Sequence, residues 1–215
     1  MPQGPGTFIT FEGIDGSGKS TQARRLAASL EAAGHDVLLT REPGGSRGAE
    51  EIRALVLEGD PDRWSPEAEI LLFTAARRDH MEKTIWPALR AGRMVISDRF
   101  ADSTRLYQGL SRGNLRALVD GLHEMMIGTE PDITFVIDMD PALGLARAKG
   151  RQTSEERFED FGEELQRSMR AGFLDLARDH PERCIVIDGN RSEDEVATDV
   201  LAQALARLPE PVAGS

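Results

Sequence analysis

Three residue types that most proteins use freely are scarce in this 215-residue sequence, which has one cysteine, one tyrosine and three lysines. The single cysteine, Cys184, excludes an internal disulfide framework and is typical of proteins of the reducing cytosol. No apolar run approaches the roughly 18–20 residues that cross a membrane. The start of the chain, MPQGPGT, lacks the charged and apolar regions of a secretory signal. We therefore expect a cytoplasmic protein with no membrane partner.

Positive charge is also in short supply. Lysine and arginine number 26 against 37 aspartate and glutamate residues, so the formal net charge is −11. General nucleic-acid-binding proteins need a broad basic surface, so we expect no nucleic-acid partner. Hydrophobic residues make up 40% of the chain, which is enough for a core and too much for wholesale disorder. The length suits a single domain over residues 1–215.

Short apolar runs predict the strands of the fold. Each run is continuous and rich in β-branched or aromatic residues, which is the pattern of parallel strands covered on both faces. Helical patterns separate the runs, and strands that alternate with helices favour right-handed crossovers. We expect an α/β fold with a doubly wound, five-stranded parallel sheet and surrounding helices. The predicted strands are residues 7–11, 37–40, 94–97, 133–137 and 185–187.

Capping signals mark where several helices begin. Ser65 precedes Pro66 in front of a pattern that continues to about Arg90, and Asp140-Pro141 opens a helix in the same way. Ser192 with Glu195 has the spacing of a capping box. An apolar stripe over residues 23–33 predicts another helix, which ends before Gly34. A charged segment at about 147–158 has the character of a short lid, and the tail from about 208 to 215 is expected to fray.

A glycine-rich loop follows the first predicted strand and precedes a helix. It matches the pattern G-x-x-x-x-G-K-[ST], in which backbone N–H groups surround a phosphate, a lysine reaches the outer phosphates and a hydroxyl ligates Mg²⁺. This arrangement predicts a P-loop NTPase-type fold that binds ATP or GTP. Ser20 is the expected Mg²⁺ ligand. The expected nucleotide-binding residues are Gly13, Ile14, Asp15, Gly16, Ser17, Gly18, Lys19, Ser20 and Thr21.

The loop alone leaves the reaction open. A regulatory GTPase reads guanine with N-K-x-D, and no asparagine precedes a lysine in this chain. A nucleic-acid-driven motor is disfavoured by the size and the acidic charge. A kinase for a small molecule remains, and it requires a second pocket for the phosphate acceptor. A nucleotide-dependent switch or binding module, without an acceptor, is the alternative from another class.

Four segments together resemble the thymidylate kinase family. They are Phe11–Gly16, the run Arg41-Glu42-Pro43-Gly44-Gly45, the helical Leu71–Arg77, and Asp98–Thr104 followed by Tyr107-Gln108-Gly109. The resemblance extends from about residue 8 to 208. It implies transfer of the γ-phosphoryl group of ATP to dTMP, with Mg²⁺, within dTTP biosynthesis and usually in a homodimer. A kinase for another nucleoside monophosphate, or for another small phosphate acceptor, is the alternative within this class.

The resemblance also implies an acceptor pocket. Phe73 and Arg77 are four residues apart and share a helix face, so a ring could stack on a base while a guanidinium donates to it. The family uses the matching residues on thymine and its O4. Without the resemblance, the favoured interpretation is that Phe73 belongs to the core and Arg77 is a surface charge. The expected substrate-binding residues are Asp15, Glu42, Pro43, Arg53, Phe73, Arg77, Arg99, Ser103, Thr104, Tyr107 and Gln108.

Several of these residues have particular roles in the family. Arg99, at the carboxyl end of a predicted strand, can grip the acceptor phosphate as a fork. Asp98 could hold Mg²⁺ directly or through water, although a simple strand-end ion pair is the alternative for both. Tyr107 matches the ring that excludes a 2′-hydroxyl. Asp15 matches the carboxylate near the 3′-hydroxyl and the acceptor phosphate. Arg53 is a second phosphate ligand or a solvated helix charge.

The catalytic cation is expected in the lid. Some family members carry an arginine inside the phosphate loop, but Gly16-Ser17 occupies that place here. The other family type supplies the arginine from the lid, where Arg151 is our first candidate and Arg147 the second. The lid departs from the common pattern at Lys149 and by about one extra residue over 152–156, so the choice between them stays open. The expected catalytic residues are Lys19, Arg99, Arg151, Asp15 and Arg147.

Overall fold

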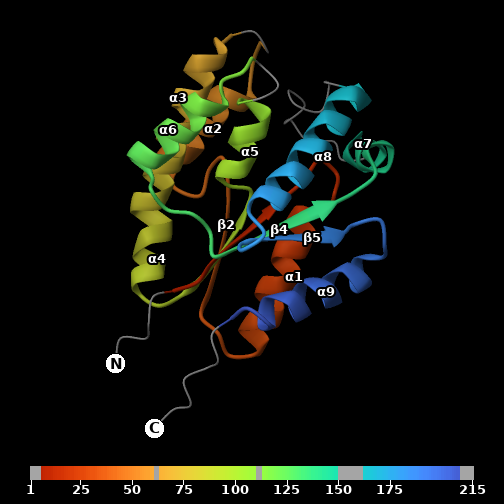
Figure 1. The fold of residues 1–215 in the computed structure, drawn as a ribbon. Coiled ribbons are helices and arrows are strands. Elements are labelled where there is room, and N and C mark those ends of the chain that lie inside the picture. The colour runs from red at the N-terminus through yellow and green to blue at the C-terminus, as the bar shows by residue number, and fades with distance from the viewer. Residues whose placement is uncertain (1–5, 61–62, 110–112, 150–161, 209–215) are drawn as a thin grey trace.

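The computed structural model describes residues 6–60, 63–109, 113–149 and 162–208. A parallel sheet of five strands lies at its centre (Figure 1). The strand order β2-β3-β1-β4-β5 shows that the chain winds outward from β1 in both directions, which confirms the predicted doubly wound α/β fold. The strands are β1 (Phe8–Glu12), β2 (Val37–Arg41), β3 (Met94–Asp98), β4 (Ile133–Asp138) and β5 (Cys184–Asp188).

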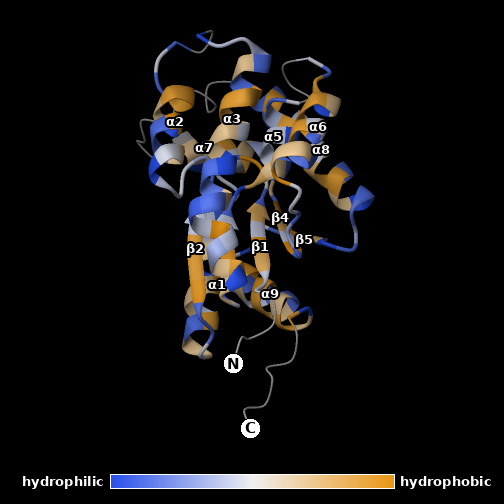
Figure 2. Ribbon diagram, turned by 90° about the vertical axis from the view of Figure 1, so that its left-hand side faces the viewer, coloured by the Kyte–Doolittle hydropathy of each residue, from blue (hydrophilic) through white to orange (hydrophobic). Residues whose placement is uncertain are grey.

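All five strands extend beyond the predicted apolar runs and end in a charged residue. Hydrogen-bonded pairing continues through these ends, so that Phe11 and Arg41 both pair with Asp98, and Asp138 pairs with Asp188. Hydrophobicity could not reveal this, because backbone pairing does not depend on side-chain polarity. The result is an apolar sheet with a charged carboxyl edge, and Figure 2 shows hydrophilic segments beyond the mainly hydrophobic β1 and β2.

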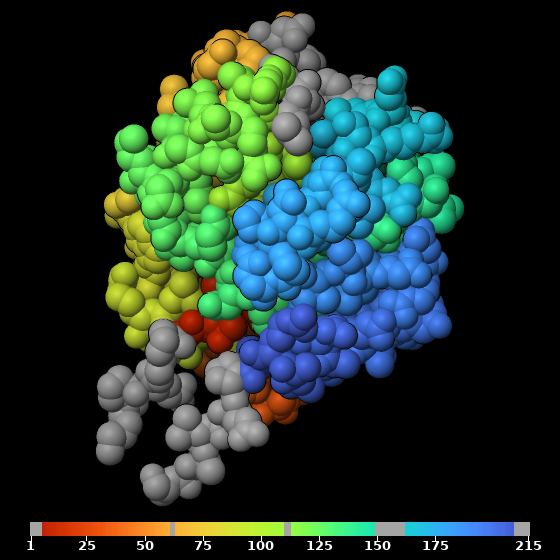
Figure 3. All heavy atoms as spheres, viewed as in Figure 1, coloured from red at the N-terminus to blue at the C-terminus, as the bar shows by residue number. Residues whose placement is uncertain are grey.

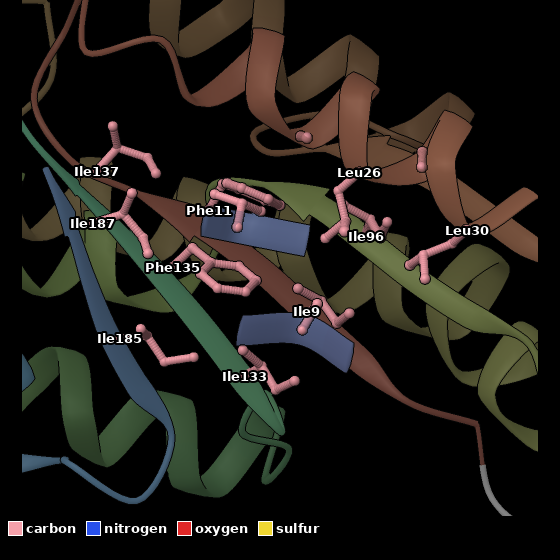
Figure 4. Close-up of a cluster of buried hydrophobic side chains, with 14 of the residues drawn as sticks. Ile9, Phe11, Leu26, Leu30, Ile96, Ile133, Phe135, Ile137, Ile185 and Ile187 are labelled. Atoms are coloured by element: carbon pink, nitrogen blue, oxygen red, sulfur yellow. The ribbon is translucent and has the colours of Figure 1, made fainter. Parts of the chain in front are cut away.

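Helices α1 (Lys19–Ala32) and α9 (Glu193–Leu205) cover one face of the sheet. Alternate residues of a strand point to opposite faces. Ile9 and Phe11 of β1 therefore lie in the core beneath α1, whereas Phe8 packs on the other face. Figure 4 shows Leu26 and Leu30 of α1 above this core. Leu208 packs against the same core, so the described chain is still in place where fraying was expected to begin, and residues 209–215 lie outside the described part.

The opposite face is covered by two groups of helices. One comprises α3 (Pro66–His80), a π-helical turn η1 (Met81–Ile85), α4 (Trp86–Arg90) and the start of α5 (Ala101–Tyr107). The other comprises the end of α5 and α8 (Gly162–Asp179). Three outer helices pack on these: α2 (Arg47–Leu57) on α3, α6 (Arg116–Met126) on α3 and α5, and α7 (Pro141–Lys149) on α8.

The predicted helix starts are confirmed by their caps. The Ser65 hydroxyl accepts from the Ala68 N–H, Asp140 accepts from the first turn of α7, and Ser192 and Glu195 form a reciprocal capping box. The helix predicted from Pro66 to about Arg90 is helical throughout, but it is not one regular α-helix. The π-helical turn of η1 interrupts it directly after His80, and π-turns have no simple sequence signal.

Two further side chains differ in burial. Cys184 is buried in the core beside α8. Met125 of α6 is 77% exposed and therefore lies outside the core. Within the described residues, no helix combines the length and apolarity required to cross a bilayer.

Candidate active site

The glycine-rich loop turns sharply between β1 and α1. Gly13 and Gly16 have φ angles of 138° and 74°, which side chains rarely adopt. A Cβ atom on Gly13 would lie 2.6 Å from the Ile137 carbonyl oxygen, and one on Gly16 would lie 2.0 Å from that of Gly144. Glycine is therefore required both by the turn and by the close approach of β4 and α7. The loop leads into the first turn of α1, whose N–H groups favour an anion.

Lys19 is buried at the start of α1 and folds back over the loop, where its Nζ donates to the Ile14 carbonyl at 2.6 Å. Burial, together with the nearby Arg99 guanidinium, lowers the pKa of Lys19 to about 8, although the carboxylates of Asp15, Asp98 and Glu12 oppose the shift. Two cations held this close repel each other. An anionic phosphate between them would relieve that repulsion.

Arg99 follows β3 and is the one described non-glycine residue with a positive φ, 70°. Its guanidinium contacts Asp15 at Oδ1 and donates to the Ser103 hydroxyl at 2.9 Å. Burial alone would raise the pKa of Asp15, but Arg99 and Lys19 hold it below its usual range. The strained backbone thus places a fork of N–H donors between the phosphate loop and α5.

Asp98 and Ser20 are the predicted metal ligands. The Oδ1 atom of Asp98 is buried without a hydrogen-bond partner in the described part of the chain. An unpartnered carboxylate oxygen of this kind fits a Mg²⁺ site, since a hydrated Mg²⁺ binds through one or two carboxylates and substrate phosphates. Ser20 lies in the first turn of α1, next to Lys19. The donor set is therefore suitable for Mg²⁺.

A cleft of about 710 Å³, partly open to solvent, lies beside the phosphate loop. Every one of the eleven predicted substrate-binding residues lines it. Phe100 and Leu57 line it too, although the sequence interpretation did not include them. The wall residues come from the phosphate loop, the β2–α2 connection, α2, α3, the end of β3 and α5: Asp15, Glu42, Pro43, Arg53, Leu57, Phe73, Arg77, Arg99, Phe100, Ser103, Thr104, Tyr107 and Gln108.

Arg77 is fixed by a buried ion pair. Its Nε donates to Glu42 Oε2 at 2.7 Å and its Nη2 to the Thr104 hydroxyl at 3.0 Å, while the guanidinium lies 5.0 Å from the centre of the Phe100 ring. Burial would raise the pKa of Glu42, but Arg77 holds it below its usual range. The interpretation of Arg77 as a surface charge is therefore wrong. Phe73, one helical turn earlier, is only 8% exposed and lines the cleft.

The polar wall on α5 is also held in place. Tyr107 donates from its hydroxyl to Asp15 Oδ2 at 3.2 Å, and burial together with that carboxylate raises the pKa of Tyr107. The Gln108 amide donates to Glu69 at 2.9 Å. Ser103 donates to Glu12 at 2.6 Å while accepting from Arg99. The hydroxyl hydrogen of Ser103 is thus directed to Glu12 and away from the cleft.

Arg53 reaches the cleft from α2. Its guanidinium contacts the Pro43 carbonyl oxygen, and the Glu42-Pro43 peptide bond is cis. Arg53 is thus not merely a solvated helix charge, because it joins α2 to the connection that carries Glu42.

A family model described as thymidylate kinase matches residues 11–200, which include the phosphate loop and every cleft residue. The chain belongs to the thymidylate kinase family. A "Thymidylate kinase" of Ruegeria pomeroyi is 74% identical over 205 residues, covering 95% of this chain and 97% of that protein. One of Dinoroseobacter shibae is 70% identical, covering 92% and 96%. The crystal structure of thymidylate kinase from Ehrlichia chaffeensis, 38% identical, matches with a TM-score of 0.75 over 93% of this chain and 99% of that one.

Three polar residues of this thymidylate kinase family member were missed by the sequence interpretation. Glu12 is fully buried and accepts from the Phe100 and Ser103 N–H groups as well as the Ser103 hydroxyl. Gln166 of α8 lies 3.5 Å from Asp15. The third residue is His80, which contacts Glu42. A glutamate and a glutamine buried in this way have no sequence signal, but His80 stands one turn after Arg77.

The lid of the family lies mostly outside the described residues. Arg151, the first candidate for the catalytic cation, falls in the undescribed segment 150–161. Arg147 lies exposed in the last turn of α7, and its Nη1 is 3.6 Å from the Met139 sulfur. Among the described residues, the structure therefore brings the phosphate loop, Arg99 and the cleft together, whereas Arg147 does not line the cleft.

Proposed function

We propose that this chain is a thymidylate kinase that transfers the γ-phosphoryl group of ATP to dTMP in the cytoplasm, as a step of dTTP biosynthesis. One observation carries the proposal. Eleven residues chosen from separate segments of the sequence line a single cleft, and that cleft adjoins the phosphate loop. Family membership supports the substrate assignment. We take residues 1–215 as one catalytic domain, with a lid at about 147–158.

The donor side is built by the loop Gly13–Ser20 and Thr21. In the proposed complex, backbone N–H groups of the loop and Lys19 hold the β- and γ-phosphates of ATP. Ser20 and Asp98 would hold Mg²⁺, which would supply neutralisation of the phosphate charge. The unpartnered oxygen of Asp98 supports that role.

The acceptor side is built for a pyrimidine nucleotide. Phe73 offers a ring face to the base, while Arg77 and Thr104 offer polar atoms to its edge. Gln108 lies on the same wall. Tyr107 and Asp15 are joined by a hydrogen bond. In the proposal Tyr107 lies under the sugar and leaves no room for a 2′-hydroxyl, and Asp15 faces the 3′-hydroxyl.

Arg99 is the proposed ligand of the acceptor phosphate, assisted by Arg53. The attacking phosphate is already ionised, so the step needs alignment and charge neutralisation rather than a strong base. Lys19 and Arg99 provide two cations at the junction of the two sites. A lid arginine, Arg151 first and Arg147 second, is proposed to complete the neutralisation and to exclude water.

We also propose a homodimer. Helices α2, α3 and α6 pack side by side and carry exposed apolar side chains, namely Leu55, Leu71, Leu118, Met125 and Met126. Figure 3 shows α6 (green) on the molecular surface. Such a patch favours a second copy. Light scattering should give twice the 23.6 kDa chain mass, and Met125→Glu should shift it toward the monomer.

The decisive experiment measures ADP release from ATP and Mg²⁺ with dTMP, dCMP, UMP, AMP and GMP as separate acceptors. Strong turnover with dTMP and little with UMP is expected, and Lys19→Met should lower kcat by at least about 1,000-fold. A preference for a purine acceptor would support another nucleoside monophosphate kinase. Nucleotide binding without any transfer would support a switch or binding module.

A further inference from the structure

His80 is a fully buried imidazole with both nitrogens engaged. It is the last residue of α3 and has no exposed surface. Its Nδ1 lies 3.1 Å from Glu42 Oε1, and its Nε2 lies 2.8 Å from the Thr40 hydroxyl. The other oxygen of Glu42 accepts from Arg77 at 2.7 Å. The Glu42 carboxylate is therefore held between an imidazole and a guanidinium.

The direction of these bonds follows from the charge of Glu42. Because Arg77 keeps the pKa of Glu42 low, its carboxylate is ionised and can only accept. Nδ1 of His80 must then carry a hydrogen and donate it. The Thr40 hydroxyl can serve Nε2 as a donor or as an acceptor, so the contact persists in either charge state of the ring. The imidazole cannot rotate without losing both contacts.

The contacts form a continuous chain across the cleft. It runs from Thr40 on β2 through His80, Glu42 and Arg77 to Thr104 on α5. The guanidinium of Arg77 is planar, so its remaining N–H groups point where the Glu42 carboxylate and Thr104 direct them. A displacement of the Glu42 carboxylate would therefore reorient the whole Arg77 guanidinium.

The backbone encloses His80 as well. A Cβ on Gly45 would lie 2.2 Å from His80 Nε2 and 2.5 Å from the Thr40 hydroxyl, so the connection after Pro43 passes directly over the ring. Thr84 of the π-helical turn donates to the Gly45 carbonyl at 2.8 Å and ties that connection down. π-Turns are frequent at functional sites. Here the turn begins immediately after His80.

We propose that His80 is a positioning residue for recognition of the acceptor base: it fixes the Glu42 carboxylate, which in turn aims the donors of Arg77 at the 4-position of a pyrimidine. The inference rests on the proposed function, because that function supplies the pyrimidine. His80 does not touch the acceptor in this proposal. It acts only through Glu42 and Arg77.

The test compares His80→Leu with His80→Asn. Leucine keeps the bulk and removes both contacts, whereas the asparagine amide can donate where Nδ1–H stood. For His80→Leu we expect the KM for dTMP to rise about tenfold and the preference for dTMP over dCMP to fall several-fold. The KM for ATP and kcat should stay within about twofold. His80→Asn should recover most of the loss, which a merely structural role would not predict.

A second pair of variants keeps the inference testable if His80→Leu does not fold. Thr40→Val should raise the KM for dTMP about threefold, whereas Thr134→Val, which removes a hydroxyl that is buried elsewhere in the sheet, should leave it unchanged. An unchanged KM for dTMP in both His80→Leu and Thr40→Val, or an equal rise in the KM for ATP, would overturn the inference. A wild-type enzyme that turns over no dTMP would refute the proposed function itself, and the inference with it.

Discussion

The two halves of the candidate active site are built in different ways. The phosphate loop is a local structure of eight consecutive residues, in which backbone conformation and two tightly packed glycines do most of the shaping. The acceptor cleft draws its walls from six separate segments, and its shape depends on side chains that bind one another. Lys19 is the only buried charged side chain of the loop, whereas the cleft contains the buried pair Arg77–Glu42 and the partly buried pair Arg99–Asp15.

The difference predicts different sensitivities. A backbone-built site should fail when a Cβ is added and should tolerate side-chain changes that leave the loop closed. A site built from linked side chains should fail when one partner is removed, because the other is left buried and unpaired. The following four expectations test this contrast.

The largest effect is expected from Gly16→Ala. The added Cβ would lie 2.0 Å from the Gly144 carbonyl oxygen, so the loop must move away from α7. Misplacement on that scale should lower kcat/KM for ATP by more than about 100-fold. Gly18→Ala is the matched control, because that glycine also has a positive φ but a Cβ there meets nothing within 4 Å. Equal losses in the two variants would show that conformation rather than collision controls the loop.

Next in size is Arg77→Leu, which removes two hydrogen bonds and leaves Glu42 buried without its cation. Loss of a charged hydrogen bond to the base costs about 1.5–3 kcal/mol, so the KM for dTMP should rise between about 10-fold and 100-fold. Steady-state kinetics with each substrate varied in turn gives the split. The double variant Glu42→Gln/Arg77→Leu should recover stability in thermal unfolding but not the KM, since no buried charge is then left alone.

Phe73→Leu should have a smaller effect. Leucine keeps the apolar contact but lacks a ring face, and the aromatic contribution beyond burial is about 0.5–1.5 kcal/mol. The KM for dTMP should rise about fivefold, with the KM for ATP unchanged. Glu67→Ala on the same helix is the control, because its side chain is exposed and does not line the cleft. A similar rise in the control would point to a general disturbance of α3.

How far the sequence could predict this molecule depends on the distance between interacting residues. The strands, the helix caps and the phosphate loop involve neighbours in the chain, so their patterns were visible. The charged strand ends and the π-helical turn after His80 were not, because no local pattern encodes them. In the cleft, the link between His80 and Glu42 joins residues 38 apart, and the Arg77–Glu42 pair joins residues 35 apart. Only the family resemblance indicated that such segments meet.

The smallest expected effect concerns Glu12 and pH. Burial and the Asp102 carboxylate together raise the pKa of Glu12 to about 7. Arg99 and the hydrogen bonds from Ser103 and Phe100 oppose this shift. A raised pKa in the folded state means that stability is fully present below about pH 4.5 and is lost as pH rises through about 7. The Tm of the wild type relative to Glu12→Gln should therefore fall over that range.

An exposed carboxylate provides the control for this pH effect. Hydrogen bonds from Ser192 lower the pKa of Glu195, so its contribution to stability is lost as the pH falls rather than as it rises. The Tm of the wild type relative to Glu195→Gln should therefore slope in the opposite direction at acid pH. Calorimetric scans from about pH 2 to about pH 8 would check both slopes. Parallel slopes in the two comparisons would contradict the assignment of the effect to burial of Glu12.

The left-handed backbone of Arg99 has a consequence for how this position can vary over generations. At φ 70° the backbone would be less strained with glycine or asparagine than with arginine. Random drift under selection for stability alone would therefore replace the arginine. In the proposed function, selection on phosphate transfer would retain the arginine against this preference of the backbone. A population freed from the need for this activity should lose Arg99 early and gain stability as it does so.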